Sequence, residues 1–592
     1  MNPKLENLLN LALETSEAVR EQTDNLNVGF DSDNRTWELI VKYHGSLDEL
    51  AALNVRVEYL IAGYAILTVP ENLVDAVGQL EEIEYAEKPK RYFYQQTAQV
   101  AESSCIYPLT RREPYLTGEG VLIAVLDSGI DYARNDFRKD DGTTRILYLW
   151  DQTTTDAQPP EGFTQGTEYT QEQINEALMI DNIPQRRALV ASIDSSGHGT
   201  AVAGIAAGYT NTTPSVFYEG AAPAASLLIV KLGLPEEDGF PRTTQIMRGV
   251  TYAVRKAVEL GMPLVINLSF GNSYGSHDGS SLLERFLDNA AEIGRTVIIV
   301  GSGNEGSSSG HAAGNARTAP SSVDLTIANY QKNLSIQLWT HYSDQYRIYL
   351  TSPNGSREEL PANIESGKYT LRMEQTELLI YFGEPSPYSV NQELYIDMLP
   401  ADAASPAAYI NSGIWRITLE PLNTISGQYY LYLPSSTARS VGTGFITPTP
   451  QVTMTIPSTA AKVITVGAYN SITEAYADFS GRGYVDTDRT IGVVTGGLVK
   501  PDLAAPGVNI LAPDLYNGYT QVTGTSFATP IISGSAALLM EWGIVRGNDP
   551  YLYGEKVKAY LRSGAQPIRG ESDYPNNRVG FGALCVAKSL PI

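Results

Sequence analysis

The pattern of hydrophobic and polar positions divides the 592-residue chain into segments of three kinds. Between residues 36 and 94, short apolar runs of strand and helix period follow one another in the order β-α-β-β-α-β. This order predicts a small ferredoxin-like domain. Its expected elements are a strand at Trp37–Tyr43, a helix capped by Ser46, a hairpin around Ala62-Gly63, a helix at Leu73–Leu80 and a last strand at Tyr85–Tyr94.

From Gly118 the pattern changes to continuous apolar runs separated by helical stretches such as Thr244–Leu260 and Ser281–Ile293. Strands buried on both faces of a parallel sheet show such runs. The alternation predicts an α/β fold with a doubly wound, mostly parallel sheet and a site at the carboxyl ends of its strands. The expected strands are Val121–Leu126, Ser226–Lys231, Leu264–Leu268 and Thr296–Val300.

Helical patterns disappear between residues 320 and 451, where short strand-like runs such as Leu334–Trp339 alternate with turn residues. Many short strands at this spacing predict a β-sandwich. The α/β pattern resumes at Ala461–Val466, so the sandwich is expected to be an insertion. The expected organisation is an N-terminal domain at 1–96, an α/β domain in two parts at 97–319 and 452–592, and the inserted sandwich at 320–451.

Composition narrows the expected partners. The formal charge of -24 disfavours nucleic acids and anionic membranes, which both attract basic surfaces. Polar residues such as Glu6 and Asn7 interrupt the N-terminal leucines, so no signal peptide is expected, and no later run approaches the ~18 apolar residues of a membrane span. Cys105 and Cys585 lie in no metal or nucleophile motif, and we expect two separate thiols in a reducing compartment.

Ser526 is the candidate nucleophile. In the segment GTSFATP, Gly524 and Thr525 close a turn, Ser526 opens a helix, and Pro530 is expected to lie early enough in that helix for its missing N–H to be harmless. A serine hydroxyl attacks well only when a neighbouring base accepts its proton. A catalytic role for Ser526 therefore requires a base, a group that orients the base, and oxyanion donors elsewhere in the chain.

Asp127 and His198 are candidates for the orienting group and the base. Asp127 ends the first buried strand in DSGID, where a carboxylate faces the usual site of an α/β sheet; the alternative is a helix cap. His198 lies in GHGT, where flanking glycines allow close backbone approach, and the alternative is a structural histidine. The other four histidines show no paired spacing for zinc, so no metal site is predicted from them.

Asn304, in GSGNEG after the strand Thr296–Val300, could donate its amide to a developing oxyanion. The same stretch matches the dinucleotide-binding pattern GxGxxG, and Asp324 stands about twenty residues on. That alternative requires a helix within the glycines. Residues 306–317 show no helical stripe, which disfavours it.

These four motifs occur in the order and contexts of the subtilisin-like serine proteases, which the chain resembles over most of residues 118–319 and 452–592. The resemblance implies that Ser526 is the nucleophile, His198 the general base and then acid, and Asp127 its orienting partner. It also implies an oxyanion hole formed by Asn304 and the Ser526 N–H. Further implied substrate-binding residues are Ser269, Phe270 and Gly271 on an edge strand and Gly301, Ser302 and Gly303 along the primary specificity pocket.

Residues 36–96 resemble the inhibitory propeptide of the same family, which is removed by self-cleavage. Past Tyr94 the chain becomes small and polar, and we expect a cut between Gln96 and Thr97. The implied partners are a protein or peptide substrate and the chain's own propeptide, retained or released after the cut.

The long spacer between Asp127 and His198, the segment Trp150–Thr153, the missing signal peptide and the inserted sandwich resemble the Csp-type germination proteases of clostridia. Those proteins carry an inserted jelly-roll domain and cleave a spore cortex hydrolase precursor, which implies a cytoplasmic or spore-associated protein. Some have lost triad residues, so the alternative function is a regulatory pseudoprotease that binds a partner. No cofactor is expected, although Asp136 matches a calcium ligand of many subtilases. A glycan-binding role for sandwich aromatics such as Trp339 is a further alternative.

Overall fold

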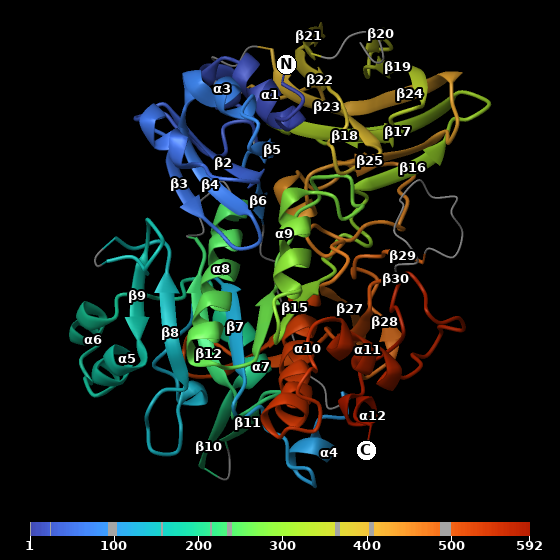
Figure 1. Ribbon diagram of the computed structural model, residues 1–592. Coiled ribbons are helices and arrows are strands. Elements are labelled where there is room, and N and C mark those ends of the chain that lie inside the picture. Colours follow the sequence, from blue (N-terminus) through green and yellow to red (C-terminus); the bar gives the residue numbers. More distant parts are fainter. Residues whose placement is uncertain are drawn as a thin grey trace.

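A computed structural model describes residues 2–23, 25–92, 104–155, 158–213, 216–233, 240–360, 367–401, 408–485 and 499–591. Figure 1 shows three bodies, with the blue N-terminal domain and the yellow-green sandwich side by side above the α/β domain. The N-terminus lies at the top, next to the sandwich, and the C-terminus lies at the bottom of the α/β domain.

The N-terminal domain has the expected ferredoxin-like arrangement, an antiparallel sheet in the order β5-β2-β4-β3. The first of the two predicted helices of the ferredoxin-like pattern is a 3₁₀ helix, η1 (Asp48–Leu53), and the predicted final strand is divided. The remaining elements are α1 (Asn7–Glu14), α2 (Glu17–Arg20), β1 (Phe30–Asp31), β2 (Thr36–Tyr43), β3 (Arg56–Tyr59), β4 (Tyr64–Pro70), η2 (Glu71–Leu73), α3 (Val74–Gly78), β5 (Ile83–Glu87) and β6 (Arg91–Tyr92).

The division of the final strand is a correction with a structural consequence. Lys88 and Pro89 separate β5 from β6, and proline cannot donate to a sheet. β6 then pairs antiparallel with β13 (Phe240–Arg242) of the α/β domain instead of continuing the N-terminal sheet. The end of the N-terminal domain is thereby bound to the α/β domain as an added strand.

The α/β domain contains the predicted doubly wound sheet, in the order β28-β27-β15-β14-β7-β12-β8-β9, with β31 beside β27. All its pairs are parallel except those that β9 and β28 make at the two ends. The strands are β7 (Leu122–Asp127), β8 (Ile146–Asp151), β9 (Thr167–Thr170), β12 (Ser226–Lys231), β14 (Leu264–Leu268), β15 (Thr296–Gly301), β27 (Ile464–Asn470), β28 (Ala475–Tyr476) and β31 (Leu503–Pro506).

Alternation along each strand creates two hydrophobic cores. In β7, Ile123 and Val125 face one layer, whereas Leu122 and Ala124 face the other. The first layer holds α7 (His198–Ala207) and α10 (Thr525–Met540), both buried along their full length. The second layer holds α8 (Thr243–Leu260) and α9 (Leu282–Ala291), against which the N-terminal sheet packs. The remaining helices include α5 (Gln171–Leu178), α6 (Ile183–Leu189), α11 (Glu555–Gly564) and α12 (Val586–Ser589).

The insertion is a sandwich of two antiparallel sheets around one core. It begins at β16 (His311–Asn315), ahead of residue 320, because β16 pairs with β25 despite its small residues. The other strands are β17 (Ser321–Ile327), β18 (Leu334–His341), β19 (Gln345–Thr351), β20 (Arg357–Leu360), β21 (Gly367–Met373), β22 (Thr376–Phe382), β23 (Asn391–Pro400), β24 (Gly413–Asn423), β25 (Gln428–Tyr432) and β26 (Gly444–Phe445).

The N-terminal domain also packs on the sandwich. Leucines of α1 share a hydrophobic cluster with Tyr381 and Tyr395 of the sandwich and with Tyr274 of the α/β domain. The N-terminal domain therefore contacts both other bodies.

Cys105 and Cys585 form a disulfide with a Cα–Cα distance of 4.8 Å, so the prediction of two separate thiols was wrong. The cysteines therefore give no support for a reducing compartment. The two residues are 480 positions apart, and only the tertiary fold brings them together.

By length and composition Thr525–Val545 could cross a membrane, but 83% of its most apolar window is buried inside the molecule, as is usual for a core helix.

Candidate active site

Two of the candidate residues stand at element ends that meet in the first core layer. Asp127 is the last residue of β7, and His198 is the first residue of α7. His198 Nδ1 lies 2.7 Å from Asp127 Oδ1, and both side chains are buried. The Ser128 N–H donates to the same Asp127 oxygen at 2.7 Å. The carboxylate is thus placed to accept the proton of Nδ1, which leaves Nε2 as the proton acceptor of the ring.

Ser526 is the second residue of α10, beside Phe527, whose ring centroid lies 5.2 Å from that of His198. Helix α10 therefore carries the serine to the layer that holds the histidine. The Ser526 hydroxyl donates to the backbone carbonyl of Ser269 at 2.8 Å. In return, the Ser269 hydroxyl donates to the backbone carbonyl of Ser526 at 2.9 Å.

The second of these bonds corrects the expectation for Pro530. An α-helical N–H at position 530 would donate to the carbonyl of Ser526, four residues earlier. Because Pro530 lacks that N–H, the Ser526 carbonyl needs another donor, and Ser269 supplies it from outside the helix. The missing N–H of Pro530 was predicted to be harmless, but it leaves a carbonyl that the Ser269 hydroxyl must satisfy.

A buried polar chain fixes Ser269. The Ser533 hydroxyl donates to Asn267 Oδ1 at 2.9 Å, and Asn267 Nδ2 donates to Ser269 Oγ at 2.8 Å. Ser533 lies on α10 and Asn267 on β14, so these hydrogen bonds join the helix that carries the candidate nucleophile to the sheet.

Asn304 lies against the start of α10. Its Oδ1 accepts from the Thr525 N–H at 3.0 Å and from the Thr525 hydroxyl at 3.1 Å, which leaves the amide nitrogen as the end available for donation. Gly524 has a φ of 150°, and a Cβ there would lie 3.0 Å from Asn304 Nδ2. Glycine at 524 therefore keeps the space in front of the amide open.

The two predicted substrate-binding segments lie on either side of Thr455. A Cβ added to Gly271 would come within 2.2 Å of Thr455 Oγ1, and one added to Gly303 within 2.4 Å. Ser302 is held by its N–H to Val466 and by its carbonyl to the Thr455 N–H at 3.0 Å. Side chains other than hydrogen at the two glycine positions would displace Thr455.

The structure adds an element that sequence reasoning missed. β13, the partner of β6, follows the strand β12 after an interval outside the described part of the chain, and it has no recognisable strand pattern. Its pairing with β6 joins the end of the N-terminal domain to the α/β domain. Gln96 and Thr97, the expected cleavage pair, lie outside the described residues, so that cut stays a prediction.

Asp194 is a second residue that the sequence analysis missed. Its buried carboxylate accepts six hydrogen bonds, from Ser128 Oγ, from the N–H and hydroxyl of Ser196, from the Gly197 N–H, and from the N–H and hydroxyl of Thr200. One carboxylate thus joins the neighbour of Asp127 to the segment that carries His198. An aspartate four residues before His198 was the available signal.

The surroundings of Asp136 do not fit a calcium ion. Its two oxygens accept from Arg134 Nε at 2.7 Å and from the hydroxyls of Thr210 and Tyr519, so a guanidinium already supplies the positive charge. Among the residues that the structure describes, no group of three or more His, Cys, Asp or Glu side chains is arranged to hold a metal ion.

The dinucleotide alternative for GSGNEG also conflicts with the geometry. Asp324, the acid that it requires, lies on β17 of the sandwich and pairs with Arg416 there at 2.6 Å. No helix starts within the glycines, because β15 ends at Gly301 and the next element is β16.

Comparison with known proteins places this site in a family. The sequence profile of the subtilase family matches residues 118–374 and 438–582, and a profile for the prodomain of Csp protease B matches residues 3–90. The solved structure of the Clostridium perfringens CspB protease is 36% identical, with a TM-score of 0.72 over 82% of this chain and 95% of that protein.

More distant curated relatives agree. The minor extracellular protease Vpr of Bacillus subtilis is 24% identical over 80% of this chain and 52% of its own length. A C5a peptidase of Streptococcus pyogenes is 25% identical over 81% of this chain and 41% of its own length. The chain thus spans about half, or less, of these relatives.

The chain belongs to the subtilase family of serine endopeptidases, and within it to the proteins that carry a Csp-type prodomain. The predicted family and fold class are confirmed.

Proposed function

We propose that this chain is an active serine endopeptidase that cuts its own propeptide and then a protein substrate. The observation that carries the proposal is the 2.7 Å pair of His198 Nδ1 and Asp127 Oδ1, next to the helix that presents Ser526. Family membership supplies the class of reaction, and the pair orients the imidazole as a general base requires.

In the proposed mechanism, substrate binding redirects the Ser526 hydroxyl from the Ser269 carbonyl toward His198 Nε2. His198 accepts the proton as Ser526 Oγ attacks the scissile carbonyl, and Asp127 stabilises the imidazolium that forms. The Asn304 amide and the Ser526 N–H donate to the oxyanion. His198 then returns the proton to the leaving amine, and water releases the acyl group by the same steps in reverse.

The position of the propeptide supports cleavage within the same chain. Two acidic side chains of its sheet, Glu38 and Glu58, bind Arg248 of α8 at 2.8 and 3.0 Å, and Glu87 accepts the Leu282 N–H at the start of α9. With β6 paired to β13, these contacts hold the N-terminal domain on the α/β domain. The same contacts would retain the propeptide as an inhibitor after the cut.

The natural substrate and the location of the protein are also part of the proposal. Kinship with the Clostridium perfringens CspB protease favours a protein substrate such as a spore cortex hydrolase precursor, and a cytoplasmic or spore-associated location. Incubation of the processed enzyme with such a precursor, beside the same enzyme blocked at Ser526, tests that role.

Labelling with a fluorophosphonate tests the proposed activity directly. We expect one label per processed molecule once the propeptide has been separated from it, located on Ser526 by peptide mapping, and none on a His198→Ala variant. An unlabelled processed protein would instead support the regulatory pseudoprotease.

A further inference from the structure

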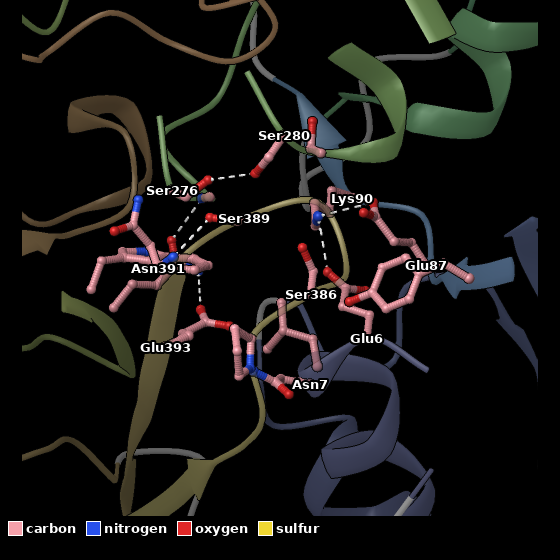
Figure 2. Close-up of a pocket in the computed structure, with 17 residues that line it drawn as sticks. Glu6, Asn7, Glu87, Lys90, Ser276, Ser280, Ser386, Ser389, Asn391 and Glu393 are labelled. Carbon is pink, nitrogen blue, oxygen red and sulfur yellow. Dashed lines mark hydrogen bonds and ion pairs between the residues drawn. The ribbon is translucent and has the colours of Figure 1, made fainter. Parts of the chain in front are cut away.

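A small buried cavity lies where the propeptide, the α/β domain and the sandwich meet. It has a volume of about 50 Å³, and its lining is rich in carboxylates and serines (Figure 2). Glu6 and Glu87 reach it from the propeptide, Ser276 and Ser280 from the α/β domain, and Glu393 from β23 of the sandwich. Each of the three domains thus contributes polar residues to the lining of the cavity.

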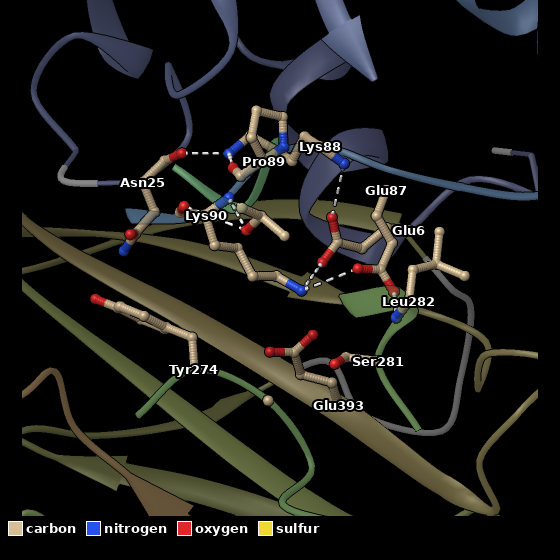
Figure 3. Close-up of polar contacts among 12 residues, drawn as sticks. Glu6, Asn25, Glu87, Lys88, Pro89, Lys90, Tyr274, Ser281, Leu282 and Glu393 are labelled. Carbon is tan, nitrogen blue, oxygen red and sulfur yellow. Dashed lines mark hydrogen bonds and ion pairs between the residues drawn. The ribbon is translucent and has the colours of Figure 1, made fainter. Parts of the chain in front are cut away.

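The charges at this cavity do not balance. Glu6, Glu87 and Glu393 are 8%, 6% and 4% exposed, and Lys90 is the cation that the structure places among them. Lys90 Nζ lies 2.9 Å from Glu6 and 3.4 Å from Glu87, between the two carboxylates in Figure 3. If all three carboxyls were ionised, the four groups would carry a net charge of about -2 in a buried space, which is costly.

Glu87 and Glu393 are held in place by hydrogen bonds to different domains. Glu87 accepts the Leu282 N–H at 3.0 Å, so it binds the start of α9. Glu393 accepts from Gln337 Nε2 on the neighbouring strand β18, so the sandwich holds it in place toward the propeptide. Separation of the propeptide would therefore take Glu6, Glu87 and Lys90 away from Glu393.

Further titratable and charged groups surround the cavity. Asp278 of the α/β domain stands just behind it and accepts from Ser389 at 2.6 Å, from Asn391 at 3.1 Å and from the Ser280 N–H at 3.0 Å, so its charge is compensated by donors. The charged groups that act on Glu87 and Glu393 are Glu6 and Lys90 of the propeptide. Tyr85 of the propeptide and Tyr388 of the sandwich interact with these carboxyls, and Arg285 of α9 lies 4.2 Å from the centroid of the Tyr388 ring.

We propose that this junction is a proton-dependent docking site for the propeptide. The propeptide binds tightly when Glu87 and Glu393 are neutral and more weakly when they are ionised. The docked form has one ion pair, Glu6 with Lys90, and two protonated carboxyls. On ionisation the two protons pass to solvent, and the four groups change from neutral to doubly negative. This inference rests on the proposed propeptide cleavage for its biological use, but the docking equilibrium itself does not require catalysis.

The pKa directions agree with this charge count. Burial, and next the Glu6 carboxylate, raises the pKa of Glu393 to about 7. Burial also raises the pKa of Glu87, although Lys90 opposes the rise. A separated glutamate has a pKa of about 4.3, so docking takes up protons between that pH and about 7. The contribution to docking is complete below about pH 4.3 and is lost as the pH rises through the docked pKa.

The test uses the full chain as the Ser526→Ala variant, with the recognition site of an unrelated protease placed within residues 97–101. Cutting after folding gives a two-chain complex whether or not the native chain is a protease. We expect the dissociation constant of the propeptide to rise with pH between about 5 and 7 by up to about tenfold per pH unit for each carboxyl, and to level off above that range.

Glu393→Gln keeps an acceptor for Gln337 but cannot ionise. We expect the slope of log Kd against pH to fall by about one proton, with binding at pH 8 up to roughly a hundredfold tighter than in the parent. Glu87→Gln should reduce the slope in the same way and serves as a second, independent variant. Glu358→Gln, at an exposed position on β20 of the sandwich, is the charge-matched control and should leave the slope unchanged.

A dissociation constant that does not change between pH 5 and 8 would overturn the proposal, as would a parental slope in both glutamine variants. Failure of the chain to cleave itself would contradict the proposed function alone, because this complex is made without catalysis.

Discussion

The hydroxyl of Ser269 donates a 2.9 Å hydrogen bond to the backbone carbonyl of Ser526, inside the helix that carries the candidate nucleophile. The carbonyl depends on this donor because Pro530 has no N–H to offer it. A residue of the predicted substrate-binding strand thus also fixes the position of the serine.

Ser269→Ala should lower both stability and turnover. The buried Ser526 carbonyl would lose its donor, which costs about 1–3 kcal/mol, and the start of α10 would shift. Adding Pro530→Ala restores an N–H four residues after Ser526, so the double variant should recover part of the loss. Urea unfolding and peptide turnover measure both effects, and a double variant no better than Ser269→Ala would refute the compensation.

Asn304→Ala should reduce kcat on a peptide substrate by about 10²–10³, with little change in KM, because the amide would act only on the oxyanion of the transition state. Asn304→Asp is the sharper variant, since it keeps an oxygen for Thr525 but loses the donor. Steady-state kinetics of the two variants provide the check. Full turnover by Asn304→Asp would exclude the assigned role.

Asp194→Asn should reduce turnover by on the order of 10²-fold, the effect of a misplacement of about 1 Å in a catalytic group. An amide cannot accept all six hydrogen bonds, so the segment that holds His198 would shift relative to Asp127. The rate of fluorophosphonate labelling should fall in parallel, whereas Asp140→Asn, at an exposed position, should leave it unchanged. Equal rates in both variants would show that Asp194 does not position the site.

Cys105→Ser should destabilise the protein by about 2–4 kcal/mol, because the disulfide with Cys585 closes a very long loop in the unfolded chain. Chemical denaturation of the variant beside the oxidised parent gives this difference. Two thiols that react with an alkylating reagent in the denatured, unreduced parent would show that the bond does not form.

Local sequence signals predicted most of the fold. The apolar runs at Leu264–Leu268 and Ser226–Lys231 are strands with those bounds, because strands buried on both faces need continuous hydrophobic residues. β13 and β16 escaped prediction, since their pairing with β6 and β25 depends on distant segments and not on their own composition. Motif context likewise pointed to Asp127, His198, Asn304 and Ser526, but motif context alone could not show the contacts of Asp194 or the disulfide.

Mass spectrometry of the purified protein beside its Ser526→Ala variant tests the central claim most directly. Only a hydroxyl is removed, and loss of a triad member in a related enzyme costs about 10⁶ in turnover. We predict that the parent consists of two fragments, cut after Gln96 or within two residues of it, and that Ser526→Ala is a single intact chain. Processing of Ser526→Ala in a preparation free of other proteases, or an intact parent, would contradict the account.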